Sequence, residues 1–214
     1  MKNNIKYSST RGKSVELLFK DVIFEGLAPD GGLYVPETWP KLEKKTLSRF
    51  SGMSYQQIAF EVISPYIDSS LSDDDLKNII DKAYSSFDHP EITPLNKIND
   101  NKYLLELFHG PTYAFKDVAM QFISQLMGFY LKQDDRSLNI LGATSGDTGA
   151  AAIESFKNIK SVKIFILHPY NKISEVQRKF MTTIKSDNVF NIAVKGSFDD
   201  CQNIIKQIFS DQSY

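Results

Sequence analysis

The sequence contains a single cysteine, Cys201, and three histidines among its 214 residues. One thiol cannot form an intrachain disulfide, and zinc sites built from several cysteines are excluded as well. No apolar run approaches the roughly 20 residues of a membrane-spanning helix, and residues 1–9 lack the apolar segment of a secretion signal. These absences predict a cytoplasmic protein that works in a reducing compartment, without a membrane and without a metal ion.

The chain also lacks an excess of charge of one sign, since it has 25 Lys and Arg residues and 26 Asp and Glu residues. Nucleic acids and anionic membranes attract clustered positive charge, so neither is an expected partner. What the sequence does contain is apolar material. Hydrophobic residues make up 42% of the chain and include 15 Phe and 10 Tyr, which is enough for one or two packed domains.

The first part of the chain, to about His89, has the pattern of a mainly helical region. Apolar residues recur at helical spacing within 15–23, 55–63 and 76–87. Ser72 precedes three aspartates, as is typical of a helix N-cap. The following segment, 89–101, contains prolines and a turn-like Asn-Asp-Asn sequence. We therefore expect a domain boundary there, with one domain at 1–92 and a second at 93–214.

From Lys102 onward, strand patterns alternate with helix patterns. Strands are predicted at 103–107, 138–141, 162–167 and 189–194, and helices at 118–127, at 150–156 and after Ser197. This alternation is typical of βαβ units in an α/β protein with a mainly parallel sheet. Ligand sites in such sheets lie at the carboxyl ends of the strands, so the loops that follow the strands are the places to look for chemistry.

The first such loop is residues 107–117, which end in Phe115-Lys116-Asp117. Lys116 lies where the loop becomes a helix, so its positive charge is opposed by the helix dipole and its hydration is restricted by apolar neighbours. Both effects favour the neutral amine, which is the nucleophile that Schiff-base chemistry requires. The alternative is a solvated lysine on a polar helix face. His109 in the same loop either contacts the site or binds nearby backbone groups.

The second loop, residues 141–151, is rich in small residues and lies between a predicted strand and a predicted helix. Its backbone N–H groups and hydroxyls could converge on a carboxylate or a phosphate. The glycine spacing fits neither the P-loop nor the dinucleotide-binding fingerprint. The alternative is an ordinary turn in which Asp147 or Thr148 caps the helix.

Together, the segments ELFHGPTYAFKD (106–117) and ATSGDTGAAA (143–152) closely resemble the threonine synthase family, whose members depend on pyridoxal 5′-phosphate (PLP) and have fold type II. Further matching segments are STRG at 9–12, GLAPDGGLYVP at 26–36 and HPYNKIS at 168–174, followed by Gln177. The resemblance implies a mainly helical N-terminal domain, followed by the first part of a three-layer βαβ catalytic domain.

The resemblance also implies roles for individual residues. Lys116 matches the lysine that forms the Schiff base with PLP and then moves protons at the substrate. Phe115 and Asp117 would shape the cofactor pocket, and Asp147 would lie near the PLP 3′-oxygen, where many relatives carry asparagine. The residues that would cradle the substrate carboxylate are Thr144, Ser145, Gly146 and Thr148.

The activity implied by the resemblance is that of a carbon–oxygen lyase acting on phosphates, in threonine biosynthesis. The substrates would be O-phospho-L-homoserine and water, and the products L-threonine and phosphate. The chemistry would belong to the cofactor. Arg11, Lys172 and Arg178 are candidates for the substrate phosphate on charge alone, and each could equally be a solvated surface residue.

Members of the family are longer than this chain, and their additional part carries the glycine-rich loop that grips the PLP phosphate. No equivalent glycine cluster is present here. We therefore expect the sequence to be the N-terminal portion of the enzyme and to be inactive by itself. Two alternatives remain: a noncatalytic relative that binds PLP or a phosphorylated ligand, and a small α/β phosphate-binding module.

Overall fold

The computed structural model describes residues 4–210. The chain divides into two compact units, Met1–Ser85 and Ser86–Tyr214. This division lies earlier in the chain than the boundary expected after residue 92.

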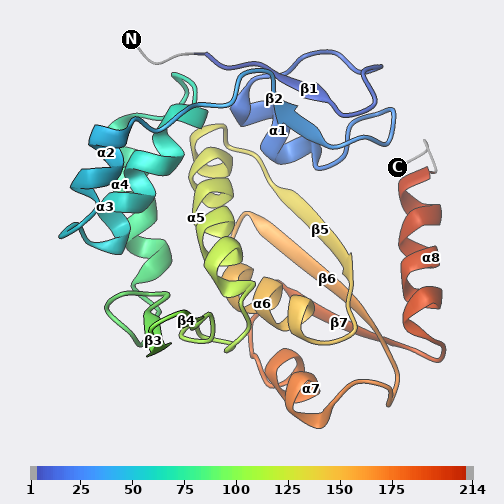
Figure 1. Ribbon diagram of the computed structural model, residues 1–214. Helices are drawn as coiled ribbons and strands as arrows, with labels where there is room; N and C mark the ends of the chain where they lie inside the picture. The colour runs from blue at the N-terminus through green and yellow to red at the C-terminus, as the bar shows by residue number, and fades with distance from the viewer. Residues whose placement is uncertain (1–3, 211–214) are drawn as a thin grey trace. The chain divides into compact units, whose positions relative to one another are not determined.

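The first unit is mainly helical, with one small antiparallel sheet (Figure 1). Its strands are β1 (Tyr7–Ser9) and β2 (Tyr34–Pro36), which pair with each other. Its helices are α1 (Phe19–Glu25), α2 (Lys44–Arg49), α3 (Tyr55–Ile63) and α4 (Asp73–Tyr84), with a short 3₁₀ turn, η1, at Ser64–Tyr66.

Helices α3 and α4 begin where the sequence carries capping residues. The Ser54 hydroxyl accepts a hydrogen bond from the Gln57 backbone N–H, and the Gln57 side-chain oxygen accepts one from the Ser54 backbone N–H. The Ser72 hydroxyl accepts from the Asp75 backbone N–H in the same way. Such caps satisfy N–H groups that have no partner inside the helix. The predicted helix at 55–63 and the Ser72 cap are confirmed.

The helix predicted within 15–23 begins later than expected. Leu17 forms an isolated antiparallel bridge with Tyr7, whose N–H donates to the Leu17 carbonyl at 2.8 Å. The backbone there is therefore extended, and the helix starts only at Phe19. Val15 is 73% exposed, so the apolar spacing at this point does not mark a buried helix face. Helix α2 was not predicted.

The second unit is built around a parallel sheet in the order β5-β6-β7. The strands are β5 (Leu138–Ala143), β6 (Val162–Pro169) and β7 (Val189–Val194), and the helices are α5 (Asp117–Gln133), α6 (Asp147–Phe156), α7 (Glu175–Thr182) and α8 (Phe198–Ser210). Helix α6 packs against β6 and α5, while α8 packs against β5 and β6 from the other side of the sheet (Figure 1). Helices thus cover both faces of the sheet, as the βαβ pattern predicted.

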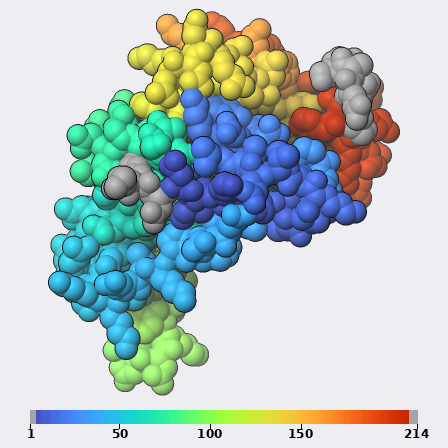
Figure 2. Space-filling model, turned by 90° about the horizontal axis from the view of Figure 1, so that it is seen from above, coloured from blue at the N-terminus to red at the C-terminus, as the bar shows by residue number. Residues whose placement is uncertain are grey.

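The strand predicted at 103–107 does not join this sheet. Strand β4 (Lys102–Leu105) instead pairs antiparallel with β3 (Leu95–Asn99), through the turn that the Asn-Asp-Asn sequence indicated. A short turn brings the two segments together locally, whereas joining a parallel sheet needs a long crossover. The hairpin's side chains lie on the surface, where they form the light green lobe in Figure 2, and all residues of both strands are exposed.

Helix α7 was not predicted from the sequence. It is short, and the Ser174 hydroxyl accepts a hydrogen bond from the Gln177 backbone N–H at its start. Its start lies at the same end of the sheet as the starts of α5 and α6, which is the carboxyl end of the strands (Figure 1). Both candidate loops and α7 therefore share one end of the second unit.

Candidate functional site

The structure brings the two candidate loops, residues 107–117 and 141–151, into contact. Lys116 is the residue directly before α5, and Asp147 is the first residue of α6. The Lys116 Nζ atom lies 2.6 Å from Asp147 Oδ2. It also lies over the Phe115 ring, 4.2 Å from the ring centroid. The lysine amine thus sits between a carboxylate and an aromatic face, and 24% of its side chain is accessible.

The contact with Lys116 sets the charge of Asp147. The hydrogen bond donated by Lys116 lowers the pKa of the Asp147 carboxyl, and its charge adds to the effect, while burial opposes it. A lowered carboxyl pKa means that Asp147 is ionised at neutral pH. The Thr148 backbone N–H donates to the other carboxylate oxygen at 3.0 Å, so both oxygens of Asp147 are engaged.

Asp117 points away from this pair and into the protein. Its side chain is fully buried and accepts hydrogen bonds from the Thr112 N–H at 2.8 Å and the Thr112 hydroxyl at 2.7 Å. Burial raises the pKa of Asp117, and the bonds from Thr112 oppose that rise. A Cβ atom on Gly110 would overlap the Asp117 side chain. Asp117 therefore holds the turn that leads to Lys116, and only glycine fits beside it.

The small-residue loop is closed around the hydroxyl of Thr144. This oxygen accepts hydrogen bonds from the backbone N–H groups of Gly146, at 3.0 Å, and Gly149, at 2.9 Å. These donors and the buried Thr144 hydroxyl therefore shape the loop from within. Among residues 4–210, the hydroxyls of Ser145 and Thr148 have no hydrogen-bond partner, so both are available to a ligand.

One face of α7 completes the surroundings of the loops. The side chain of Gln177 lies against Gly146, where a Cβ atom would overlap the carboxamide. Gly146 has φ 149°, in the region that favours glycine. Phe180 contacts Tyr113, with ring centroids 6.1 Å apart. No sequence pattern assigned a role to this face, and the Ser174–Gln177 capping pair is the signal that locates the helix.

The cationic candidates are placed differently. Lys172 and Arg178 are exposed, the former before α7 and the latter on it. Arg11 belongs to the first unit, where its guanidinium donates to the Asp30 carbonyl at 2.8 Å. None of the three is held in a buried position that would single it out as a phosphate ligand.

His109 binds carboxylates rather than the backbone. Its ring nitrogens lie 2.9 Å from Asp88 Oδ1 and 2.7 Å from Glu106 Oε2. The bond to Glu106 and then the contact with Asp88 raise the pKa of His109, against an opposing effect of desolvation. The imidazole therefore fastens the loop of Lys116 to the segment that carries Asp88.

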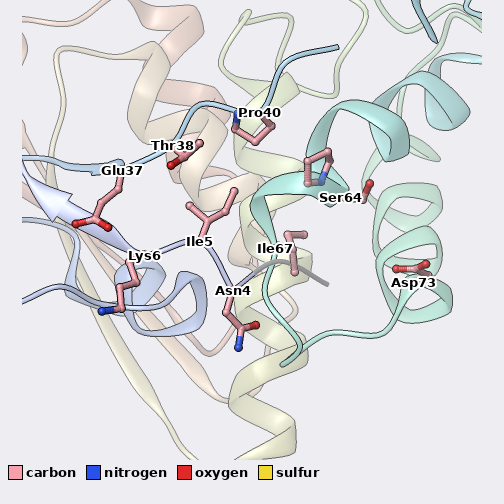
Figure 3. A pocket seen from close by; sticks show the side chains of 10 residues that line it. Asn4, Ile5, Lys6, Glu37, Thr38, Pro40, Ser64, Ile67 and Asp73 are labelled. Atoms are coloured by element: carbon pink, nitrogen blue, oxygen red, sulfur yellow. The ribbon is translucent and has the colours of Figure 1, made fainter. Parts of the chain in front are cut away.

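A pocket in the described part of the first unit contains no residue of either motif. The first unit has a pocket of about 680 Å³, which mixes apolar and charged side chains (Figure 3). Residues that line it include Ile5, Pro40, Ile67, Lys6, Glu37 and Asp73. We assign it no ligand. Within residues 4–210, no helix is both long and apolar enough to cross a membrane.

Comparisons with known proteins show what the chain is similar to. Residues 6–84 match the family model described as threonine synthase N terminus. A threonine synthase of Pseudomonas aeruginosa is 47% identical over 210 residues, which covers 98% of this chain and 45% of that protein. The chain spans about half the length of the curated relatives it matches.

Crystal structures agree with the sequence match. The PLP-bound threonine synthase from Brucella melitensis superposes with a TM-score of 0.93 at 42% identity, covering 98% of this chain and 45% of that one. Threonine synthase from yeast gives a TM-score of 0.92 at 42% identity, with coverage of 98% and 44%. The chain is similar in sequence and in fold to the N-terminal part of threonine synthases, and the resemblance stated above is confirmed.

Proposed function

We propose that this chain is the N-terminal part of a PLP-dependent threonine synthase of fold type II, a cytoplasmic carbon–oxygen lyase acting on phosphates. The substrates would be O-phospho-L-homoserine and water, and the products L-threonine and phosphate. Residues 1–92 would form the N-terminal domain and residues 93–214 the first part of the catalytic domain. The similarity to threonine synthases along 98% of the chain supports this proposal.

The observation that carries the proposal is the pair formed by Lys116 and Asp147. The two residues come from separate motifs, and the fold brings their charged atoms to 2.6 Å. A lysine at the start of a helix, partly shielded from water, is the kind of amine that can attach an aldehyde cofactor. Neither a phosphate-binding module nor a purely structural loop requires this lysine.

The residues present fit PLP. The Lys116 side chain remains 24% accessible, and its amine is held by contacts that an incoming aldehyde can replace. The face of Phe115 beside it offers apolar surface for a ring. Asp147 is the residue that fits PLP least easily, because its carboxylate would repel an ionised 3′-oxygen. The two groups would therefore share a proton.

When bound, PLP supplies an electron sink that stabilises negative charge on the substrate carbons and so permits loss of the phosphate. The chain's own residues handle the protons. The Lys116 amine is the group placed to take a proton from the substrate and return it. In the cofactor-free chain, Asp147 is ionised at neutral pH because the lysine lowers its pKa, and it keeps that amine oriented.

The small-residue loop would bind the substrate carboxylate. The free hydroxyls of Ser145 and Thr148 would donate to it, while Thr144 and Gly146 keep the loop in shape. Asp117 would act as a positioning residue beneath Lys116 rather than touch the cofactor. All of these donors are neutral, so the carboxylate would be held by hydrogen bonds.

The attachment of PLP is tested by reductive trapping. The 214-residue chain is incubated with less than one equivalent of PLP, reduced with borohydride and mapped by peptide mass spectrometry. We expect the pyridoxyl group on Lys116, and we expect no phosphate release from O-phospho-L-homoserine by residues 1–214 alone. The variant Lys116→Ala should lose the label and the visible absorption band.

Lys132→Ala is the matched control, since Lys132 is an exposed lysine at the far end of the same helix, α5. It should retain full labelling at Lys116. Labelling spread evenly over surface lysines would argue against the enzyme proposal. A stable complex with PLP that is independent of Lys116 would favour a noncatalytic binding protein.

A further inference from the structure

Helix α7 touches both functional loops with one face. Gln177 and Phe180 are three residues apart and so lie on the same side of the helix. Phe180 contacts Tyr113 in the loop before Lys116, and Gln177 lies against Gly146 in the small-residue loop. The helix therefore forms a wall that both loops share, and Gln177 is the polar residue of that wall.

The two ends of the Gln177 carboxamide have different surroundings. The Ser174 hydroxyl donates to Oε1 at 3.0 Å, and the backbone N–H of Gln177 donates to the same hydroxyl at 3.2 Å. The oxygen end is thereby fixed at the start of α7. The whole carboxamide lies against Gly146, with Oε1 nearer than Nε2 to the position that a Cβ atom there would take. Among the described residues, 4–210, the Nε2 group donates to no acceptor.

We propose that Gln177 is a substrate-binding residue, whose Nε2 group donates a hydrogen bond to the α-carboxylate of the amino-acid substrate. The inference rests on the proposed function, which puts that carboxylate at the small-residue loop. The Gln177 amide and the hydroxyls of Ser145 and Thr148 would form a set of neutral donors. Glycine at position 146 then has a second purpose, because it allows the carboxamide to approach the loop backbone.

The charge of the surroundings favours a carboxylate over the phosphate at this point. Hydrogen bonds from neutral donors to an ionised acceptor are stronger than neutral ones, and a carboxylate carries only a single negative charge. A phosphate dianion would meet the ionised Asp147 without a bidentate arginine to offset the repulsion. The substrate phosphate therefore belongs to another part of the site.

The test uses the 15N-labelled 214-residue chain without cofactor. O-phospho-L-homoserine is added, and the backbone amide signals of Ser145, Gly146 and Thr148 are followed by NMR. We expect these signals to shift with a measurable Kd. Gln177→Glu should raise that Kd at least about tenfold, because it replaces the donor by a repelling carboxylate. Val176→Ala, an exposed neighbour on α7, should leave it unchanged.

A change in the ligand identifies the group that Gln177 binds. Replacing the substrate's α-carboxylate by a carboxamide should weaken binding to the native chain more than to Gln177→Met, which keeps the side-chain length without the donor. L-homoserine, which lacks the phosphate, is the comparison ligand. If its loss of binding, rather than that of the carboxamide, is larger for the native chain than for Gln177→Met, the assignment to the carboxylate is wrong. Urea denaturation of each variant verifies that it is folded at the temperature of the titration.

Two results would overturn the inference: the loop signals of the native chain do not shift, or Gln177→Glu and Gln177→Met bind the substrate as tightly as the native chain. Neither depends on PLP. Failure to trap PLP at Lys116 counts against the proposed function, whereas an unchanged Kd in the Gln177 variants counts against Gln177 alone.

Discussion

Removal of the Asp117 carboxylate should destabilise the second unit, because no other group in the structure replaces it. The carboxylate accepts two hydrogen bonds from Thr112, which is itself buried with 7% exposure. In Asp117→Ala, the Thr112 N–H loses its acceptor and stays away from water, at a cost of about 1–3 kcal/mol. The small cavity left behind adds to this cost. We expect a total loss of about 2–4 kcal/mol.

Asp117→Asn separates the effect of charge from that of shape. The amide oxygen can still accept one of the two hydrogen bonds, so the expected loss is smaller, about 1–2 kcal/mol. Urea denaturation followed by circular dichroism gives the free energies of unfolding. Gln133→Ala, an exposed position at the end of the same helix, should change the free energy by no more than about 0.5 kcal/mol.

The same variants connect stability to the site. The turn held by Asp117 leads directly to Lys116, so both substitutions should reduce trapping of PLP at that lysine. If Asp117→Ala unfolds at the same urea concentration as the native chain, the turn is not held by these hydrogen bonds. If it is destabilised as expected while trapping is unchanged, Asp117 supports the fold without positioning the lysine.

Three further predictions concern other contacts. The pKa of His109 is raised in the folded chain. The stability that the charged imidazole contributes is therefore present below the unfolded pKa of about 6.5 and is lost as the pH rises through the folded pKa. In urea denaturation, His109→Gln should cost more stability near pH 6 than near pH 9, and equal costs would contradict the ion pairs. Gly149→Ala should destabilise the chain by about 1–3 kcal/mol, because the added Cβ would lie 2.5 Å from the Thr144 side chain and 2.8 Å from the Met181 sulfur; thermal unfolding without a lower midpoint would refute this. Ser72→Ala should cost about 1 kcal/mol through the lost cap of α4, measured by urea denaturation, and an unchanged midpoint would show that the cap is dispensable.

The sequence was most informative where local patterns decide structure. The Ser72 cap specifies the start of α4 because a helix leaves its first N–H groups without partners. The alternation after residue 138 specified the parallel sheet, since a buried strand and an amphipathic helix have different apolar periods. The same reasoning misplaced the strand at 103–107, because an apolar strand pattern does not say which strand it pairs with.

At the candidate site, too, the sequence determined some features and only the tertiary structure decided others. The sequence by itself determined the resemblance to threonine synthases, through the motifs around Lys116 and Asp147, and the residue types that can do the chemistry. Only the tertiary structure decided that the lysine meets the carboxylate, that Asp117 turns inward to Thr112, and that Gln177 of an unpredicted helix lies on the small-residue loop. The physical reason is that these contacts join residues that are distant in the chain or depend on side-chain direction. Side-chain direction is set by packing in three dimensions, which the order of residue types along the chain does not reveal.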